Sequence, residues 1–170
     1  MNLETNFDKD KLPYRSCVGI ALFNKHGHVF VGERIDAPGG WQMPQGGIDE
    51  NEDILAAAHR ELAEETGVLH AQIIKVAPDK LRYDVPIDLS MKHWGGQYRG
   101  QEQTWVAMRF MGEDNAIKLD LHLPQEFDRW QWVSLKDTIS LVVPFKQEIY
   151  RQVYNLFKDI GPVKVQESRY

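Results

Sequence analysis

Apolar and polar residues in the first part of the chain are arranged as in two paired strands followed by a loop. Residues 14–23 form a mostly apolar run that predicts a buried strand, and residues 28–34 predict its strand partner. The turn between them contains Gly27, which accepts a positive φ without steric penalty. Residues 36–47 hold too many glycines and prolines for regular structure, so we expect a shaped loop there.

Helical spacing begins after this loop. A helix is predicted from Asn51, a favourable N-cap, to Gly67, a favourable C-cap. Acidic residues in its first turn suit the positive end of the helix dipole. Its buried stripe is predicted to contain Leu55, Ala58 and Leu62.

The second half of the chain predicts further strands. Residues 73–85 contain one or two strands, whereas residues 88–100 are expected to be irregular. Residues 103–111 alternate between apolar and polar side chains as a strand does, and residues 125–133 predict another short strand.

A last helix is predicted over residues 145–160, with Pro144 at its first position and apolar residues at helical spacing. The predicted order is therefore β-β-loop-α-β-β-α. This order is typical of an α/β (α+β) sandwich with helices packed on a sheet.

Composition indicates one folded domain. The chain has 170 residues, of which 42% are hydrophobic and 11% aromatic, enough for a core. We expect a flexible start over residues 1–11, one domain over residues 12–160 and a tail over residues 161–170. The single cysteine, Cys17, lies in a predicted buried strand, so we interpret it as a core thiol in a reducing, cytoplasmic setting. The first residues lack the basic region and apolar run of a signal peptide, and no stretch approaches about 18 consecutive apolar residues, so we expect neither a signal peptide nor a membrane span.

The net charge of −5 argues against a protein that coats long duplex DNA, because such proteins are usually basic. It does not exclude a small polyphosphate or one RNA end, held by metal ions and a few cationic side chains. We expect no binding to DNA or membranes, and a monomer or weak homodimer.

Three glutamates, Glu61, Glu64 and Glu65, lie on one face of the predicted central helix, since residues three and four apart are neighbours. Carboxylates at this spacing repel one another, and no lysine shares the face to offset them. Hard divalent cations prefer oxygen ligands. The cluster therefore predicts a site for Mg²⁺ or Mn²⁺, and with it phosphate chemistry.

Reading outward from the glutamates gives Gly46, five residues, Glu52, seven residues, and then the run Arg60-Glu61-Leu62-Ala63-Glu64-Glu65-Thr66-Gly67-Val68. This pattern resembles the Nudix box at every defined position from Gly46 to Val68. The resemblance implies a Nudix-type α/β/α sandwich with a central mixed sheet, in which the box forms a loop-helix-loop. It also implies hydrolysis of a nucleoside diphosphate linked to another group.

Segments outside the box resemble one Nudix subfamily, the bacterial RNA pyrophosphohydrolases and the related dinucleoside polyphosphate hydrolases. The likeness extends over about Leu12 to Phe157, nearly the whole chain, and departs at the end, where the longer basic tail of some relatives is not found. The segments are Pro13-Tyr14-Arg15, residues 41–49, Leu81-Arg82-Tyr83, residues 100–105, residues 126–130 and residues 142–146.

The resemblance implies roles for the acidic residues. The predicted metal ligands are Gly46 through its carbonyl, Glu61, Glu64, Glu65 and the distal Glu126, and they would hold two or more Mg²⁺ or Mn²⁺ ions. The general base is Glu65, Glu64 or Glu126, and the sequence does not choose between them. By the same resemblance, Glu52 and Arg60 form ion pairs that support the box.

Substrate residues are also carried over from the resemblance. Arg15, Lys146 and Arg34 are candidates for phosphate binding, and Phe145 for base stacking. Gln101 and Gln103 could face the phosphates, and Tyr83 and Trp41 could form cleft walls. The alternative readings are ordinary surface cations for the three basic residues and core packing for Phe145. Trp105, Trp130 and Trp132 are interpreted as mainly core residues, and the histidines show no zinc-ligand spacing.

The leading functional hypothesis is an RNA pyrophosphohydrolase that removes pyrophosphate from 5′-triphosphate RNA ends and leaves a 5′-monophosphate. The nearest rival is the same chemistry on diadenosine polyphosphates. A Nudix enzyme acting on sugar nucleotides or damaged nucleoside triphosphates is a third possibility, and a non-catalytic nucleotide- or RNA-binding module a fourth. Intact Glu61, Glu64 and Glu65 argue against the last of these, because binding alone does not require three mutually repelling carboxylates.

Overall fold

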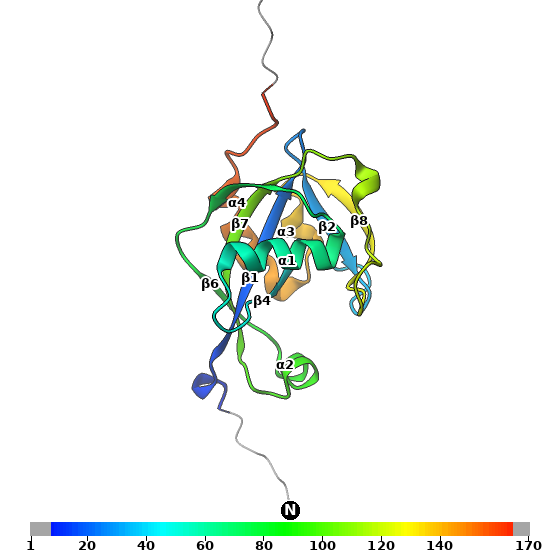
Figure 1. The fold of residues 1–170 in the computed structure, drawn as a ribbon. Coiled ribbons are helices and arrows are strands. Elements are labelled where there is room, and N and C mark those ends of the chain that lie inside the picture. Colours follow the sequence, from blue (N-terminus) through cyan, green and yellow to red (C-terminus); the bar gives the residue numbers. More distant parts are fainter. Residues whose placement is uncertain (1–7, 165–170) are drawn as a thin grey trace, which may run out of the picture.

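A computed structural model describes residues 8–164 of the chain (Figure 1). Its strands join into one sheet in which β3, β2, β1, β7 and β5 are neighbours in that order. Three short strands extend this path, because β4 pairs with β1, β6 with β7 and β8 with β2. The bounds are β1 Tyr14–Phe23, β2 Val29–Arg34, β3 Trp41–Gln42, β4 Gln45–Gly47, β5 Gln72–Val76, β6 Leu81–Asp84, β7 Gly100–Arg109 and β8 Phe127–Val133.

The sheet is mixed. β1 and β7 run parallel over their whole length, from the pair Tyr14 and Gly100 to the pair Phe23 and Arg109, whereas the other pairings are antiparallel. The helices are α1 Ile54–Thr66, α2 Ile87–Trp94, α3 Thr138–Leu141 and α4 Gln147–Phe157. Short 3-10 helices lie at η1 Lys9–Lys11, η2 Asp114–Ala116 and η3 Pro144–Lys146.

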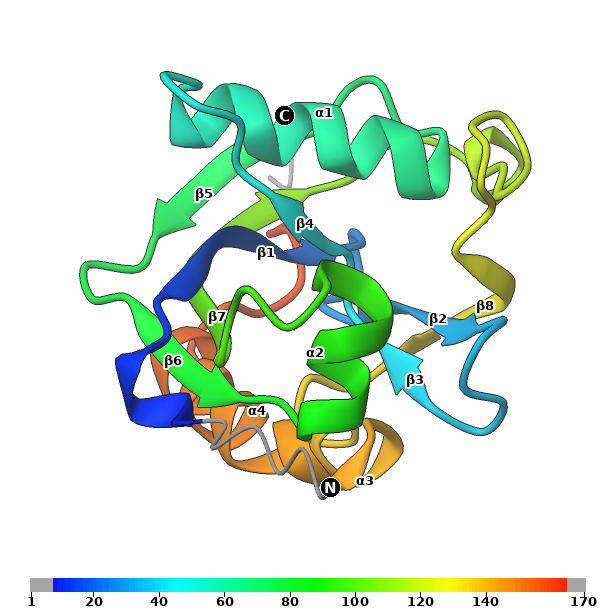
Figure 2. The same ribbon diagram turned by 90° about the horizontal axis from the view of Figure 1, so that it is seen from below.

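Helices cover both faces of the sheet, as Figure 2 shows: α1 lies on one side, and α3 and α4 lie on the other. Each face has its own core. On the first, Ala58 and Leu62 of α1 pack against β-strand residues such as Val18 and Phe30. On the second, apolar residues of α4 pack against Trp105, which is fully buried. The predicted α/β/α sandwich with a central mixed sheet is confirmed.

The central helix begins later than predicted. Asp53, not Asn51, is the N-cap, because its carboxylate accepts hydrogen bonds from the N–H groups of Leu55 and Ala56. Asn51 instead adopts a positive φ of 61° in the preceding turn. The predicted C-cap is confirmed, since Gly67 has a φ of 75°. Leu55 is exposed, so its predicted place in the buried stripe is wrong.

Two predicted irregular segments contain regular structure. The segment 36–47 includes β3 and β4, which pair with β2 and β1. Glycines permit this pairing because β4 passes close to side chains: a Cβ on Gly46 would overlap the Glu61 carboxylate. The segment 88–100 includes most of α2, a helix that contributes only one side chain, Ser90, to the buried interior.

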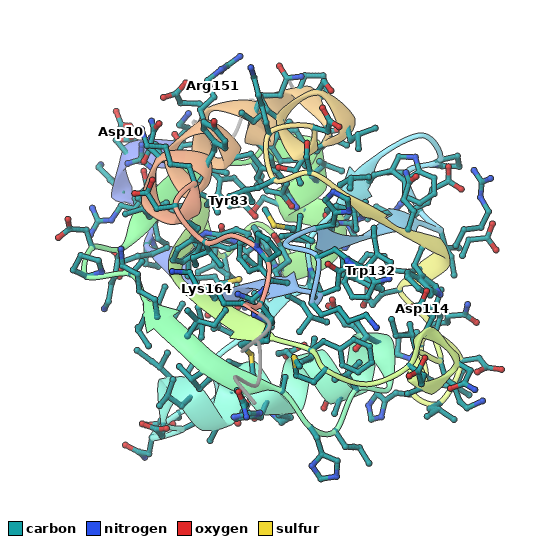
Figure 3. The ribbon with its side chains drawn as sticks, turned by 90° about the horizontal axis from the view of Figure 1, so that it is seen from above. Asp10, Tyr83, Asp114, Trp132, Arg151 and Lys164 are labelled. Carbon is teal, nitrogen blue, oxygen red and sulfur yellow. The ribbon has the colours of Figure 1, made fainter. Side chains whose placement is uncertain are left out.

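The other elements are close to prediction. The last helix is split, since Pro144 begins the 3-10 helix η3 and α4 follows directly. Trp130 and Trp132 pack against the core at its margin, and the indole N–H of Trp132 donates to Asp114 at 3.0 Å (Figure 3). Cys17 is buried, as expected of a core thiol, and burial raises its pKa to about 11.

The predicted domain limits stay predictions. Of the predicted flexible start, residues 1–7 lie outside the described part, and η1 forms within the remainder. The last residues of the predicted tail, 165–170, also lie outside it. Within residues 8–164, no helix is long and apolar enough to cross a membrane.

Candidate active site

A cleft of about 740 Å³ is lined by residues of the box, of α2 and of η3. Most of the predicted site residues line it, although they come from eight segments of the chain. They are Arg15, Arg34, Gly46, Glu61, Glu64, Glu65, Tyr83, Gln101, Glu126, Phe145 and Lys146.

The box glutamates reach this cleft because α1 packs its apolar stripe on the sheet and turns the adjoining face toward β4. Glu61 and Glu65 are 9% and 7% exposed, and Glu64 is half-buried. The carboxylate of Glu65 accepts a hydrogen bond from the N–H of Gln45 at 3.2 Å. The backbone of Gly46 passes directly against the carboxylate of Glu61. The predicted ligands Gly46, Glu61 and Glu65 are therefore neighbours.

Arg60 joins the start of the box to its centre. Its Nε and Nη2 donate to the two carboxylate oxygens of Glu52 at 2.8 and 2.7 Å, and Nη2 also donates to the carbonyl of Gly47 at 2.8 Å. Its Nη1 donates to Glu61 Oε1 at 2.8 Å and lies 3.5 Å from Glu64 Oε2. Hydrogen bonding to Arg60 lowers the pKa of Glu52 to about 2. This geometry fits the predicted supporting role of both residues.

Electrostatic repulsion builds up among the remaining carboxylates. Burial raises the pKa of Glu65 well above its ordinary value, and the charges of Glu61 and Glu126 raise it further. Burial also raises the pKa of Glu61, against the opposing effect of Arg60. The protein therefore holds several acids close together at a cost that bound cations would offset.

Glu126 reaches the cleft from a distant part of the chain. It follows the loop that ends at Pro124, and its carbonyl accepts a hydrogen bond from the N–H of Ile35 at 3.1 Å. This bond fixes the backbone of Glu126 beside β2. Its side chain is exposed on the rim, close enough for its charge to act on both Arg34 and Glu65.

The predicted cations differ in their surroundings. Lys146 is 3% exposed, and its amino group donates to Gln42 Oε1 at 3.0 Å and to Gln45 Oε1 at 3.4 Å. No salt bridge to Lys146 is present among the described residues. Arg34, by contrast, is paired through Nε and Nη2 with both carboxylate oxygens of Asp36, each at 2.7 Å. Lys146 is thus a buried cation facing the cleft with neutral partners only.

A continuous row of contacts links four of the predicted substrate residues. The Phe145 and Tyr83 rings are 6.2 Å apart, and the Tyr83 hydroxyl accepts a hydrogen bond from Gln101 Nε2 at 2.6 Å. The amide oxygen of Gln101 in turn accepts one from Arg15 Nη1 at 3.0 Å. Aromatic, amide and guanidinium groups therefore lie side by side along one wall.

Two predicted substrate residues do not line the cleft. Gln103 is fully buried, where its Nε2 donates to Gln45 Oε1 at 3.1 Å, so it can act on the site only through Gln45. Trp41 packs against the core, and the guanidinium of Arg129 lies 5.2 Å from its ring centre.

Comparison with known proteins agrees with the box. The NUDIX domain family matches residues 13–155. The chain belongs to the Nudix family. It is 52% identical over 153 residues to an RNA pyrophosphohydrolase of Novosphingobium aromaticivorans, covering 88% of this chain and 95% of the relative. It is 50% identical over 161 residues to an RNA pyrophosphohydrolase of Sphingopyxis alaskensis, covering 92% and 98%.

Solved Nudix structures share the fold at low sequence identity. The E. coli dihydroneopterin triphosphate pyrophosphohydrolase has a TM-score of 0.64 at 16% identity, covering 82% of this chain and 96% of that one. A C. elegans Ap4A hydrolase complex has a TM-score of 0.61 at 18% identity, covering 85% and 98%. At such identities the likeness shows the fold alone.

Nudix hydrolases generally depend on a divalent metal. Within residues 8–164, no three acidic, histidine or cysteine side chains converge tightly enough to form a ready-made metal cage. The donors nevertheless fit such an ion, because oxygen ligands suit hard cations and the acids facing this cleft already repel one another. Bound ions would draw these carboxylates together.

Sequence reasoning missed several residues of this Nudix cleft. Gln42 and Gln45 hold Lys146 and Glu65, and both lie in the segment 41–49 that carried the family resemblance. α2 also sends side chains into the cleft. The sequence did contain a signal for α2, because its apolar residues Ile87, Met91 and Trp94 are spaced four and three positions apart, as on one face of a helix.

Proposed function

We propose that this protein is an RNA pyrophosphohydrolase. Water attacks a phosphorus of the 5′-triphosphate, and the bond from that phosphorus to the bridging oxygen breaks. Pyrophosphate is released, and the RNA keeps a 5′-monophosphate. The relatives that share 43–52% identity along most of the chain are named for this reaction, which supports the proposal. The structural observation that carries it is one cleft lined by both the box carboxylates and the buried Lys146.

In this proposal Glu61, Glu64, Glu65, Glu126 and the Gly46 carbonyl would hold two or more Mg²⁺ or Mn²⁺ ions. Bound ions of this kind neutralise charge on phosphate oxygens and lower the pKa of water. Arg60 keeps the Glu61 carboxylate aimed at the cleft, since it also binds Glu52 and the Gly47 carbonyl.

Proton transfer from water falls to one of the cleft carboxylates. Burial, with the charges of Glu61 and Glu126, raises the pKa of Glu65 well above its ordinary value, so Glu65 is a basic carboxylate that also lines the cleft. Glu126 and Glu64 stay alternatives, as both also line the cleft. Separate Glu→Gln variants would identify the base by the loss of the acidic limb of the pH profile of kcat, the limb on which kcat rises as the base loses its proton.

Residues on the other side of the cleft from the box glutamates would bind the phosphates and the base. Lys146 is already desolvated and has no acidic partner in the described part of the chain, so a phosphate oxygen would gain a full ionic contact there. Within residues 8–164, the neutral Gln101 is the only side chain that accepts a hydrogen bond from Arg15, so its guanidinium is also available to an anion. Phe145 presents a ring on which a base can stack.

The test is direct. Purified protein with Mg²⁺ and a 5′-triphosphate RNA should release pyrophosphate and leave 5′-monophosphate RNA. RNA ends that stay triphosphorylated at several RNA lengths and with Mn²⁺ as well would contradict the proposal.

Diadenosine polyphosphates are the rival substrate, since the same cations and stacking ring would accept them. A matched comparison of kcat/KM on triphosphorylated RNA and on diadenosine tetraphosphate separates the two. We expect the RNA value to be higher. A clearly higher kcat/KM on diadenosine tetraphosphate would make dinucleoside polyphosphates the substrate. The assignment of the site residues would not change.

A further inference from the structure

Trp94 differs from the other tryptophans of the chain in what surrounds it. Trp41, Trp105, Trp130 and Trp132 all belong to, or pack against, one of the two hydrophobic cores. Trp94 is partly buried but is part of neither, and it lines the catalytic cleft. An indole ring that lines a cleft and belongs to neither core is available to contact a ligand there.

The helix that carries Trp94 is positioned to serve the cleft and not the core. Figures 1 and 2 show α2 beyond the end of the sheet, on neither of the two helical layers. Ser90 anchors it, because its hydroxyl and carbonyl bond to the backbone of Tyr98 and Gly96. On one side its Ile87 and Met91 are 49% and 55% exposed, while Leu89 and Trp94 line the cleft.

Trp94 lies at one end of the row of contacts along the cleft wall. The guanidinium carbon of Arg15 is 5.8 Å from its ring centre, and Arg15 continues the row through Gln101 and Tyr83. Phe145 lies at the other end, against Tyr83. The row therefore has an aromatic ring at each end and hydrogen-bonding and cationic groups between them.

This order of groups matches a ligand that carries two nucleobases joined through charged phosphates. Nucleobases stack on aromatic rings without needing a particular sequence, whereas phosphates favour a guanidinium such as that of Arg15, which lies between the two end rings next to Trp94. Tyr98 packs against the Trp94 ring at a right angle, with ring centres 5.9 Å apart and planes at 89°, and within residues 8–164 no aromatic ring stacks parallel on Trp94.

We propose that Trp94 is a second base-stacking residue, which together with Phe145 lets the cleft bind a substrate through two nucleobases. The proposal rests on the proposed function, and its substrate class is a 5′-triphosphorylated end with at least two nucleotides. Substrates without a second base would not use Trp94.

The experiment measures dissociation constants by calorimetry in the presence of Mg²⁺, so that it does not depend on turnover. The two probes are a triphosphorylated dinucleotide with non-hydrolysable phosphate linkages and inorganic tripolyphosphate, which has no base. Trp94→Ala should weaken dinucleotide binding about 5- to 150-fold, the range expected for one stacked base, and leave tripolyphosphate binding unchanged. Trp94→Phe should restore most of the affinity.

Met91→Ala provides the matched control, because Met91 lies on the same helix but outside the cleft lining. It should bind both probes as the unsubstituted protein does. If Trp94→Ala weakened the binding of both probes equally, Trp94 would act only by holding Arg15 in place, and the proposal would be overturned. An unchanged dinucleotide affinity in Trp94→Ala, or an equal loss in Met91→Ala, would also overturn it. Absence of RNA turnover by the unsubstituted protein would instead count against the proposed function.

Discussion

The amino group of Lys146 donates a hydrogen bond to the amide oxygen of Gln42 at 3.0 Å, inside the wall of the cleft. A buried lysine is usually paired with an acid, because desolvation disfavours its charge. Here the partners are neutral amides and the nearby rings of Tyr83 and Phe145. The arrangement keeps a weakly compensated cation next to the acids of α1, which suits a site that receives phosphate.

This relationship predicts an unusual dependence of stability on pH. Burial, aided by the charge of Arg34, lowers the pKa of Lys146 to about 7, below its value in the unfolded chain. Between pH 7 and about 10 the unfolded chain then binds more protons, so the free energy of unfolding from this group rises with pH, by at most about 1.4 kcal/mol per pH unit. Lys146→Met should flatten that rise in urea titrations. Parallel pH profiles for the two proteins would contradict the low pKa.

Glu65→Gln should separate activity from stability. The amide lacks the charge needed to bind a metal or accept a proton, so we expect turnover of triphosphorylated RNA to fall about 100- to 10,000-fold. The thermal midpoint should stay equal or rise, because the change relieves the burial cost and repulsion that act on this carboxylate. If the double variant with Glu61→Gln keeps its activity, the assigned site is wrong.

Gly46→Ala should disturb the cleft through a single methyl group. Its Cβ would overlap the Glu61 carboxylate, so either the side chain or β4 must shift. A displacement of about 1 Å at a catalytic group can cost about 100-fold in rate, and we expect a loss of that order in kcat. Gly161→Ala is the control, since a Cβ there meets nothing within 4 Å. Full activity of Gly46→Ala would show that the close approach has no catalytic role.

Arg60→Ala should lower both stability and activity, because it removes four hydrogen bonds that tie Glu52, Gly47 and Glu61 together. We expect the thermal midpoint to fall by several degrees. Arg60→Lys should recover little, since an ammonium group cannot reproduce the planar fork. The exposed pair of Arg151 with Glu148 offers a comparison, and Arg151→Ala should change the midpoint little. Equal midpoints for the Arg60 and Arg151 variants would contradict the supporting role.

The box and most of the fold could be predicted from sequence because they depend on local spacing. The apolar run of β1, the alternation in β7, the Gly67 cap and the glutamates of α1 all show as patterns within one segment. The start of α1 was wrong by a few residues, because both Asn51 and Asp53 are good caps and only the side-chain geometry chooses between them. α2 was missed because the glycines at 95 and 96 outweighed its short helical spacing.

Contacts between distant segments were harder to predict. The pairing of Lys146 with Gln42 joins residues that are 104 positions apart, and no local pattern marks it. Gln103 and Trp41 had the right residue types for a cleft, yet the register of β7 and the packing of β3 turned them away from it. Resemblance could point to the segments involved, but the orientation of each side chain follows from the tertiary fold.

Ion binding by the acidic face of α1 is the claim on which the other assignments depend. Crystals soaked in Mn²⁺ together with a non-hydrolysable nucleotide test it most directly, because the anomalous signal of manganese locates each ion. We predict at least one ion between the nucleotide phosphates and the carboxylates of Glu61 and Glu65, and its loss in Glu61→Gln combined with Glu65→Gln. Ordered nucleotide in the cleft with no manganese beside these glutamates would contradict the account.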